Sequence, residues 1–583
     1  MRRPRLGDGA SVSSLGVLLR LVRFSPRSFA LCVLYATLIY CWLPLPLGLA
    51  TQAFFDSLAG PSASPNVWTA IVVLVAVQVV EALAGPLLGT PWSPLQQTSQ
   101  VLLRRNLFAA ILAGYGQHGL PARAGETISR FRDDPEHIAD ALDAVCDLIG
   151  RSCFAVVAVV VMWRTSPTLT LVACLPLVLS ALVTQALGDR IMAYRTAARA
   201  ATGQVTGFIG EALGAQLAVT VASAVPHVVG RLVELGDTRR RLAVRDTVFG
   251  ALLGSLSLNL VHLGTGLVLL LGAQAIRDGA FSVGDFALFV VYLDQLSWYP
   301  EEIGRLLGDL KRIEVSIGQM MQLVPDEPPG ALVRSAPVYL DGRLPALSAP
   351  PMRQRLERLE VERLSYVHPS SGRGICDVSF SLERGSFTVI TGRIGAGKTT
   401  LLQVMLGLLP RTAGEIRWNG QPIDQPAAFF VPPRSALTPQ VPHIFSDSLR
   451  DNLLLGLDQA TVELAVLDRA IRAAVLEPDV ALLEHGLDTL VGPRGVKLSG
   501  GQVLRVAAAR MFVHDAELLV LDDLSSALDA ETAAVLWQRL FDRAGERTCL
   551  VVSHHPAVLR RADQILHLED GRLVAARPPE VRL

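Results

Sequence analysis

Lysine is nearly absent from this 583-residue chain, which contains only Lys311, Lys398 and Lys497. Arginine supplies the remaining positive charge, and the formal net charge at pH 7 is zero. A chain without excess positive charge lacks the electrostatic surface on which nucleic-acid binding depends, so we predict no nucleic-acid partner. Because lysine is so rare here, a lysine inside a phosphate-binding sequence carries unusual weight.

Cysteine is also sparse, and its seven residues form no C-x-x-C pair. Most of them lie in apolar stretches, which favours small buried hydrophobic side chains over a disulfide framework or a metal site. Residues 1–28 contain arginines but no apolar core followed by a small-residue cleavage site. We therefore expect no cleaved signal peptide, and the segment is too short for a peptidase domain.

Apolar residues, by contrast, make up half of the chain, and the mean hydropathy is +0.39. This is too apolar for an ordinary soluble enzyme and fits a membrane domain joined to a soluble one. Six stretches are each close to the ~20 residues that cross a bilayer. They cover residues 29–54, 67–90, 144–163, 167–188, 247–272 and 283–304.

The arginines of this half are unevenly distributed. They concentrate before the first stretch and in the two long connections, residues 91–143 and 189–246, whereas the alternate loops hold almost none. By the positive-inside rule, both termini are predicted to be cytoplasmic, in a multi-pass protein that we expect in a bacterial plasma membrane. Helical apolar spacing within the connections predicts that the spanning helices continue into the cytoplasm and turn back there.

An ionisable residue inside the apolar stretches is costly, which makes Asp294 in the sixth stretch a candidate for lining a substrate path. The alternative is a position near an interface or in a cytoplasmic extension, and the same two readings apply to Glu81, Asn259 and His262. A proline- and alanine-rich segment then separates the apolar half from a pattern of alternating strands and helices. We predict a cytoplasmic segment at 1–28, a membrane domain at 29–323, a linker at 324–356 and a nucleotide-binding domain at 357–583.

A phosphate-binding loop follows the predicted strand Phe387–Ile390. Residues Gly392–Thr399 match the G-x-x-x-x-G-K-[ST] pattern, in which backbone N–H groups and a helix N-terminus face phosphate groups. The lysine adds a point charge, and the threonine hydroxyl can bind Mg²⁺. A second apolar strand, Leu518–Leu521, delivers Asp522 as a carboxylate for the same ion. The predicted nucleotide contacts are Gly392, Arg393, Ile394, Gly395, Ala396, Gly397, Lys398, Thr399 and Thr400.

The sequence Leu498-Ser499-Gly500-Gly501-Gln502 precedes that acidic strand end. Together these motifs resemble the ATP-binding-cassette (ABC) family, and the six-span half resembles its exporter-type half-transporters over essentially the whole chain. The resemblance implies an all-α six-helix membrane domain with cytoplasmic extensions, followed by an α/β P-loop ATPase domain. It also implies ATP and Mg²⁺ as ligands, and a head-to-tail dimer in which Leu498–Gln502 acts on the partner subunit's ATP.

The same resemblance implies roles for several single residues. Tyr366 would stack on adenine, although the alternative is a core tyrosine at a strand end. Gln440 would touch Mg²⁺ and sense the membrane domain, and His554 would contact the γ-phosphate. Ser526, Ala527, Leu528 and Asp529 would form the loop that crosses to the other ATP site.

Two segments of the membrane half also fit the family. Gly125–Arg130 looks like the first cytoplasmic coupling region, and Glu211–Gly214 loosely resembles the second. The sequence Leu498–Gln502 is called the signature. Two departures from the family lie near it. Pro493 stands where exporters usually have glutamate, and Val503-Leu504 replaces a usually polar pair.

The departure with mechanistic weight is Asp523, where the family has the glutamate that polarises the attacking water. Aspartate is one methylene shorter, and a misplacement of about 1 Å can cost ~100-fold in rate. This favours a heterodimer in which the partner's site hydrolyses ATP. The alternative is a homodimer in which backbone adjustment or an intervening water lets Asp523 serve as the base.

Two functional classes follow. The favoured one is ATP-driven transport, most often export, of a small molecule, lipid or peptide whose identity the motifs do not specify. The other is a non-transporting membrane regulator or channel subunit built on the same fold, which a transport or ATPase assay would distinguish. Soluble ABC ATPases share the cassette motifs, but the six predicted spans exclude them.

Overall fold

The computed structural model describes residues 13–59, 66–88, 92–114, 124–325, 327–339, 342, 354–369, 371–459, 462–493, 495–524, 528–542 and 547–577. The chain divides into two compact units. The first comprises Met1–Ala113 and Leu120–Leu340, and the second comprises Gly114–Gly119 and Asp341–Leu583.

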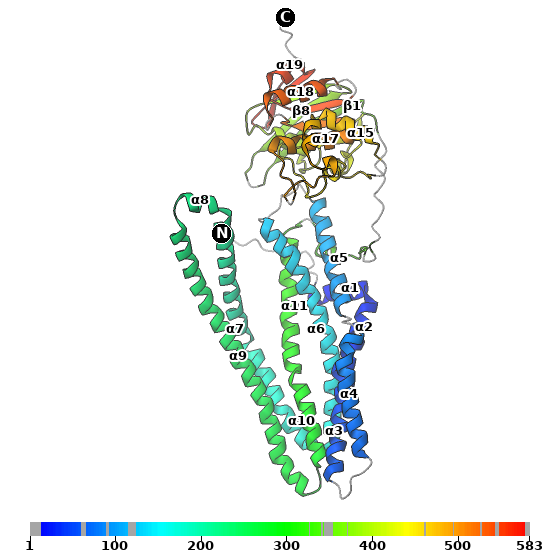
Figure 1. The fold of residues 1–583 in the computed structure, drawn as a ribbon, viewed down its shortest axis with the longest axis vertical. Helices are drawn as coiled ribbons and strands as arrows, with labels where there is room; N and C mark the ends of the chain where they lie inside the picture. The colour runs from blue at the N-terminus through cyan, green and yellow to red at the C-terminus, as the bar shows by residue number, and fades with distance from the viewer. Residues whose placement is uncertain are drawn as a thin grey trace. The chain divides into compact units, whose positions relative to one another are not determined.

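The described residues of the first unit form helices joined by short turns, followed by an irregular segment after the last long helix (Figure 1). Its N-terminal part contains α1 (Ser14–Phe24), α2 (Pro26–Thr37), the π-helix η1 (Leu38–Trp42), α3 (Pro44–Ala59), α4 (Asn66–Leu88) and α5 (Trp92–Ala113). The rest contains α6 (Ala124–Thr165), α7 (Pro167–Gly214), α8 (Gln216–Val221), α9 (Val225–Arg277), α10 (Val283–Ser297), α11 (Tyr299–Met321) and the 3₁₀ turn η2 (Pro329–Ala331).

Within the described residues, four segments are long and apolar enough to cross a membrane: Pro26–Leu58, Val67–Ala84, Thr127–Thr165 and Pro167–Gly188. They coincide with the first four predicted spans. The fifth predicted stretch lies inside the long helix α9, and the sixth is divided between α10 and α11 at Trp298. That division coincides with Pro300 in the first turn of α11, where the missing N–H of proline is tolerated.

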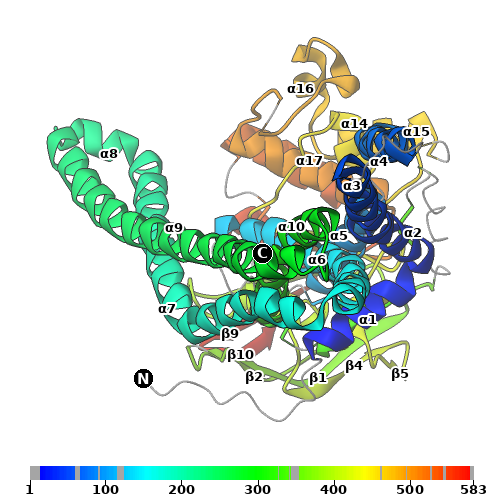
Figure 2. The ribbon, with the colours of Figure 1, turned by 90° about the horizontal axis from the view of Figure 1, so that it is seen from below.

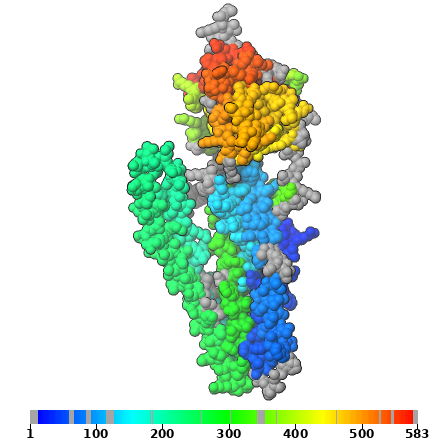
Figure 3. Space-filling view, in the orientation of Figure 1, coloured from blue at the N-terminus to red at the C-terminus, as the bar shows by residue number. Residues whose placement is uncertain are grey.

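The described residues of the long basic connections are helical, as predicted, apart from short turns. Helices α7 and α9 run far beyond the apolar stretches and are joined by the short helix α8, forming a hairpin that is visible from two directions in Figures 1 and 2. In Figure 3 the end of this hairpin projects away from the other helices of the unit. In the first connection, the described residues form α5 and the start of α6.

Helix α6 is the centre of the first unit and packs closely against α2. A Cβ atom placed on Gly150 would lie 2.6 Å from the carbonyl oxygen of Ala36, so only glycine permits this approach. On the same interface the Arg151 guanidinium lies 4.1 Å from the centre of the Tyr40 ring. Toward α11, Asp147 and Arg305 form an ion pair at 3.3 Å.

The segment after α11, which opens the predicted linker at 324–356, packs on the first unit. Val324, Leu332 and Val333 are buried in its core. The Asn106 side chain on α5 donates hydrogen bonds to the carbonyl oxygens of Leu332 and Arg334, at 3.0 and 2.8 Å. Apolar residues among the prolines supply this burial, which a composition-based linker assignment overlooks.

The second unit contains two sheets. The four-stranded antiparallel sheet has the order β2-β1-β4-β5, and the six-stranded sheet has the order β10-β9-β3-β8-β7-β6. In the second sheet, β9, β3, β8, β7 and β6 are parallel, and β10 pairs antiparallel with β9. The strands are β1 (Arg358–Val367), β2 (Gly374–Glu383), β3 (Phe387–Thr391), β4 (Ala413–Trp418), β5 (Gln421–Pro422), β6 (Ser435–Thr438), β7 (Leu518–Asp522), β8 (Thr548–Val552), β9 (Gln564–Glu569) and β10 (Arg572–Arg577).

Helices surround these strands. They are α12 (Lys398–Met405), α13 (Pro426–Phe429), α14 (Leu449–Leu453), α15 (Leu464–Ala473), α16 (Glu477–Leu482), η3 (Gly486–Asp488), α17 (Gly500–Val513), α18 (Ala530–Phe541) and α19 (Pro556–Arg561). The order of strands and helices confirms the predicted α/β class for this half, and the first unit confirms the all-α class for the other.

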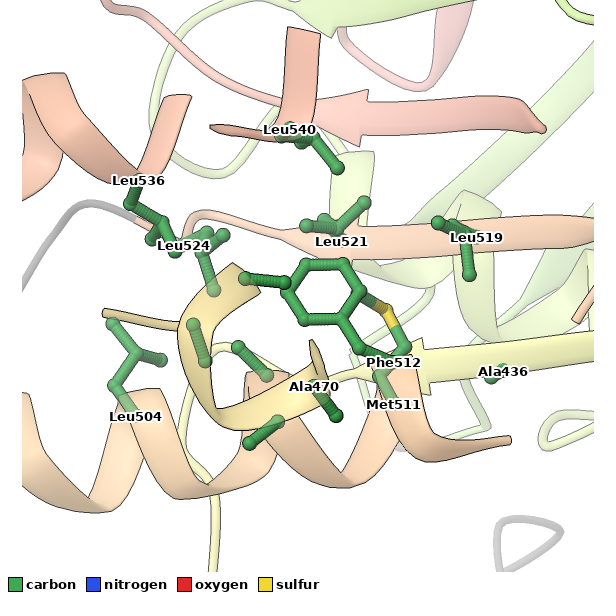
Figure 4. Close-up of a cluster of buried hydrophobic side chains, with 14 of the residues drawn as sticks. Ala436, Ala470, Leu504, Met511, Phe512, Leu519, Leu521, Leu524, Leu536 and Leu540 are labelled. Atoms are coloured by element: carbon green, nitrogen blue, oxygen red, sulfur yellow. The ribbon is translucent and has the colours of Figure 1, made fainter. Parts of the chain in front are cut away.

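The core of the six-stranded sheet positions the end of β7. All five residues of β7 are buried, as expected for a parallel strand covered on both faces. Figure 4 shows Leu519 and Leu521 of this strand between Met511 and Phe512 of α17 and Leu540 of α18. Leu518 and Val520, on the other face of the strand, belong to a second cluster. The strand is therefore packed on both faces up to the point where its acidic residues begin.

Candidate nucleotide-binding site

The glycine loop lies between β3 and α12, and its glycines are required by geometry. Gly392 has φ +145°, and a Cβ there would lie 2.1 Å from the carbonyl oxygen of Leu568. Gly397 has φ +97° and is the N-cap of α12. Both conformations disfavour residues that carry a side chain. Among the predicted nucleotide-binding residues of the loop, three are exposed, Arg393, Ile394 and Gly395, and Ala396 is buried.

Lys398 is the first residue of α12, and its side chain turns back into the loop. Its Nζ atom donates hydrogen bonds to the carbonyl oxygens of Gly392 and Arg393, at 2.8 and 3.0 Å. Burial lowers the pKa of the ammonium, and the nearby carboxylates of Asp522 and Asp523 oppose this shift. The loop therefore encloses a fixed positive charge where phosphate groups would enter.

Two carboxylates leave the end of β7 beside this charge. Asp522 is buried, and burial raises its pKa, whereas a hydrogen bond from Thr399 and the charge of Lys398 lower it. Thr399 and Asp522 thus lie together as an oxygen donor pair of the kind that Mg²⁺ prefers. The glycine cradle, the lysine and this oxygen pair fit a nucleotide bound with Mg²⁺.

Asp523 follows directly with φ +53°, in the left-handed region that aspartate tolerates better than most residues. Its backbone N–H donates a 3.2 Å hydrogen bond to the carbonyl oxygen of Val552 at the end of β8. The side chain is half-buried and close enough to Lys398 to affect the pKa of that ammonium.

Parallel strand order brings further predicted residues to the same edge. Gln440 follows β6, Asp522 ends β7, His554 follows β8 and the glycine loop follows β3. Because carboxyl ends of parallel strands share one edge of a sheet, these segments converge there. The His554 ring is exposed, with its Nδ1 atom 3.4 Å from the Thr391 hydroxyl, and Gln440 is also exposed.

Tyr366 is 3% exposed and belongs to a core cluster that includes residues of both sheets. This burial fits the alternative of a core tyrosine at a strand end, and stacking on adenine stays a prediction. His368, two residues later, is exposed and lies in edge-to-face contact with the Tyr366 ring at 6.3 Å. Residues two apart along a strand point to the same face, so strand alternation does not separate the two positions. His368 is exposed because it follows the last residue of β1.

The signature begins α17. Ser499 is its N-cap and forms a reciprocal capping box with Gln502: the Ser499 Oγ accepts from the Gln502 N–H at 3.3 Å, and the Gln502 Oε1 accepts from the Ser499 N–H at 2.7 Å. Ser499 and Gly500 are exposed, whereas Leu498 and Gly501 are half-buried. An exposed helix N-terminus with no side chains on its first two residues can approach a phosphate closely.

The loop predicted to cross to the other ATP site is described in part. Ser526 and Ala527 lie outside the described residues. Leu528 packs at the edge of the core, and Asp529 caps α18 by accepting a 2.8 Å hydrogen bond from the Thr532 N–H. That bond is the largest factor lowering the pKa of Asp529.

The predicted residues of the membrane half are distributed differently. Asp294 is exposed on α10, and its part in a substrate path stays a prediction. Gly125–Arg130 forms the first turns of α6, where the Arg130 side chain donates to the carbonyl oxygen of Gln319 at the end of α11 at 3.1 Å. Glu211–Gly214 forms the end of α7 beside α8, so this second segment lies at the turn of the long hairpin.

Sequence reasoning missed Asp479 in the short helix α16. Its carboxylate accepts hydrogen bonds from Gln502 at 2.9 Å and from Arg505 at 3.0 Å. No local pattern reveals this contact, because it joins two helices across a long loop.

Comparisons with known proteins agree with this arrangement. A family model described as ABC transporter transmembrane region matches residues 29–299, and one described as ABC transporter matches residues 375–526. The chain is 27% identical over 482 residues to antigen peptide transporter 2 of Homo sapiens, covering 81% of this chain and 66% of that protein. It is 28% identical over 467 residues to a probable multidrug resistance ABC transporter ATP-binding/permease protein of Bacillus subtilis, covering 78% and 75%.

A third relative is the ATP-dependent lipid A-core flippase of Burkholderia pseudomallei, 29% identical over 376 residues, with 64% of this chain and 60% of that protein covered. The chain thus spans 66% and 60% of the length of two of these relatives. A solved structure titled as a bacterial Atm1-family ABC exporter with ATP bound has the same fold, with a TM-score of 0.74, 21% identity, and coverage of 96% of this chain and 95% of that one.

The two matched models together cover most of the chain, in the order of membrane domain followed by ATP-binding domain. The second of these is an ATPase domain coupled to transport. The chain belongs to the ABC transporter family and is an exporter-type half-transporter, an integral membrane protein with its ATPase domain at the C-terminal end.

Proposed function

We propose that this chain is the weakly hydrolysing half of a heterodimeric ATP-driven exporter. It binds ATP with Mg²⁺ on its own glycine loop, and it presents its signature to the ATP of a different half-transporter, whose site carries most of the hydrolysis. Both termini lie in the cytoplasm of a bacterial cell, and the substrate is a small molecule, lipid or peptide. The observation that carries the proposal is Asp523 at the end of β7.

The structure leaves little freedom for Asp523 to compensate for its short side chain. The five preceding residues are buried within the sheet, and the Asp523 N–H is bonded to Val552 on the neighbouring strand. Its backbone is therefore anchored by the preceding strand and by this hydrogen bond. A general base must reach within about 2.6–3.2 Å of the water it activates, and the aspartate carboxylate is withdrawn by about one bond length relative to glutamate.

The other groups of this site remain suited to binding. Lys398 and the loop N–H groups attract phosphate oxygens, and Thr399 and Asp522 would hold Mg²⁺, which when bound neutralises charge on those oxygens. Nucleotide binding at this site would then hold the two ATPase domains together without rapid turnover. The helical hairpin α7–α9 would carry their closure to the membrane.

The deciding experiment is the ATPase activity of this chain purified alone in lipid. We expect little turnover, because two copies place Asp523 in both sites. Robust turnover by the lone chain that is abolished in Asp523→Ala would refute the heterodimer and make Asp523 the catalytic base of a homodimer. Co-purification of a second half-transporter with glutamate after its Mg²⁺-binding aspartate would support the proposal.

A further inference from the structure

A carboxylate lies behind the first turn of the signature helix. Asp479 of α16 accepts a 2.9 Å hydrogen bond from the Gln502 Nε2 atom, and its second oxygen lies 2.8 Å from an Arg505 Nη2 atom. Gln502 and Arg505 are three residues apart on α17 and share one face of that helix. Asp479 therefore contacts the signature helix at two successive points. Helices α16 and α17 are both labelled in Figure 2.

The side-chain amide of Gln502 is held at both ends. Its oxygen accepts from the Ser499 N–H at 2.7 Å, and its NH₂ group donates to Asp479. If the amide were rotated by half a turn, its NH₂ group would meet another donor at Ser499, and its oxygen would meet a carboxylate at Asp479. Asp479 therefore selects the one orientation of Gln502 that closes the capping box.

Burial distinguishes this contact from an ordinary surface ion pair. The side chains of Arg505 and Asp479 are 14% and 13% exposed. A neighbouring pair from the same short helix, Glu477 with Arg539 of α18, lies at the same 2.8 Å but is 36% exposed on each side. Water competes less for the buried pair, so removing one partner leaves an unpaired buried charge.

The capping box in turn controls the exposed end of α17. Ser499 and Gly500 are exposed, and the first N–H groups of a helix have no partner within it. The direction of the Ser499 hydroxyl and of these N–H groups depends on the conformation of the cap. We propose that Asp479 is a positioning residue for the ABC signature: through Gln502 it fixes the cap that presents Ser499 and Gly500 to the partner subunit's ATP.

This inference rests on the proposed function, in which the signature acts on the partner's site. The test uses the assembled transporter and compares Asp479→Asn, which keeps the shape but loses the charge, with Glu477→Gln as the matched control on the same helix. We expect the kcat for ATP hydrolysis to fall about tenfold in Asp479→Asn, below the ~100-fold that a misplacement of 1 Å can cost. Photolabelling of this chain's own glycine loop by an azido-ATP probe should stay unchanged.

A purely structural role predicts a different set of results. It would lower kcat equally in Glu477→Gln and Asp479→Asn, or lower own-site labelling and the unfolding temperature together with kcat. Either result would overturn the inference. Asp479→Glu, which keeps the charge and both acceptor oxygens, should recover most of the lost turnover, and failure to exceed Asp479→Asn would count against it.

A double-mutant cycle with Gln502→Ala isolates the proposed route. If Asp479 acts through Gln502, the double variant should be no slower than the slower single variant. Multiplicative losses would show that the two residues act separately and would reject the inference. Gly500→Asp separates this failure from a failure of the proposed function: if Gly500→Asp abolishes turnover while Asp479→Asn does not affect it, only the role of Asp479 is wrong.

Discussion

The second unit has two ends that we propose to face nucleotide, and they are held in place differently. At the edge of the six-stranded sheet, buried parallel strands fix the backbone of Asp522 and Asp523, and the side chain of the catalytic position is short. At the start of α17, side chains hold the cap, and the signature is complete. Under the proposed function, the difference means that this chain retains what it contributes to its partner better than what it needs for its own hydrolysis.

The largest expected effect on turnover comes from disrupting the signature at the start of α17. Gly500→Asp places a carboxylate on the exposed first turn of α17, where it would repel phosphate groups of the partner's nucleotide. Turnover of the assembled transporter should fall about a hundredfold or more. The control is Leu464→Asp at the exposed first position of α15, which should leave turnover unchanged. Normal turnover in Gly500→Asp would reject the composite site.

Lys398→Ala tests whether this chain's own site, at the glycine loop, binds nucleotide. Loss of a charge-assisted contact to phosphate should lower the affinity of this chain's own site by about 10- to 100-fold. The measurement is nucleotide labelling of this subunit with the partner's site blocked, and the control is Lys311→Ala on the exposed face of α11. Unchanged labelling would mean that the glycine loop does not hold the nucleotide.

Asp523 tests this comparison directly, because the heterodimer and the homodimer predict effects of different size for its replacement. In the assembled heterodimer, Asp523→Ala should change the ATPase rate only a few-fold, since the partner's glutamate already supplies the base. A working base lost from a homodimer would instead cost about a hundredfold or more. Asp523→Glu should raise the rate by adding a second competent site, measured under identical nucleotide concentrations.

The smallest effect on binding is expected at Tyr366. Because its ring is part of the core, Tyr366→Phe should leave both nucleotide affinity and stability nearly unchanged. Tyr366→Ala should lower the free energy of unfolding of the ATPase domain by about 3 kcal/mol through loss of buried surface. Calorimetry together with nucleotide titration separates the two effects. A large loss of affinity in Tyr366→Phe would restore a direct contact.

Features formed by contiguous residues could be predicted from the sequence, whereas features that join distant segments could not. The strand, loop and helix around Lys398 are contiguous, so spacing alone predicts them. The burial of Tyr366 depends on where β1 ends, because His368, two residues later and past the end of the strand, is exposed. The packing of Leu332 on the first unit and the contact of Asp479 with Gln502 join distant segments, and composition carries no record of such pairs.

The scarcity of lysine has a practical consequence at the glycine loop. Burial lowers the pKa of Lys398, so at a given pH more of it is the neutral amine, which is the form that reacts with acylating reagents. With only two other lysine side chains in the chain, a peptide map after mild acylation would contain very few modified amines. Protection of Lys398 by ATP, read by mass spectrometry, would report occupancy of this site in native membranes without purification or mutation.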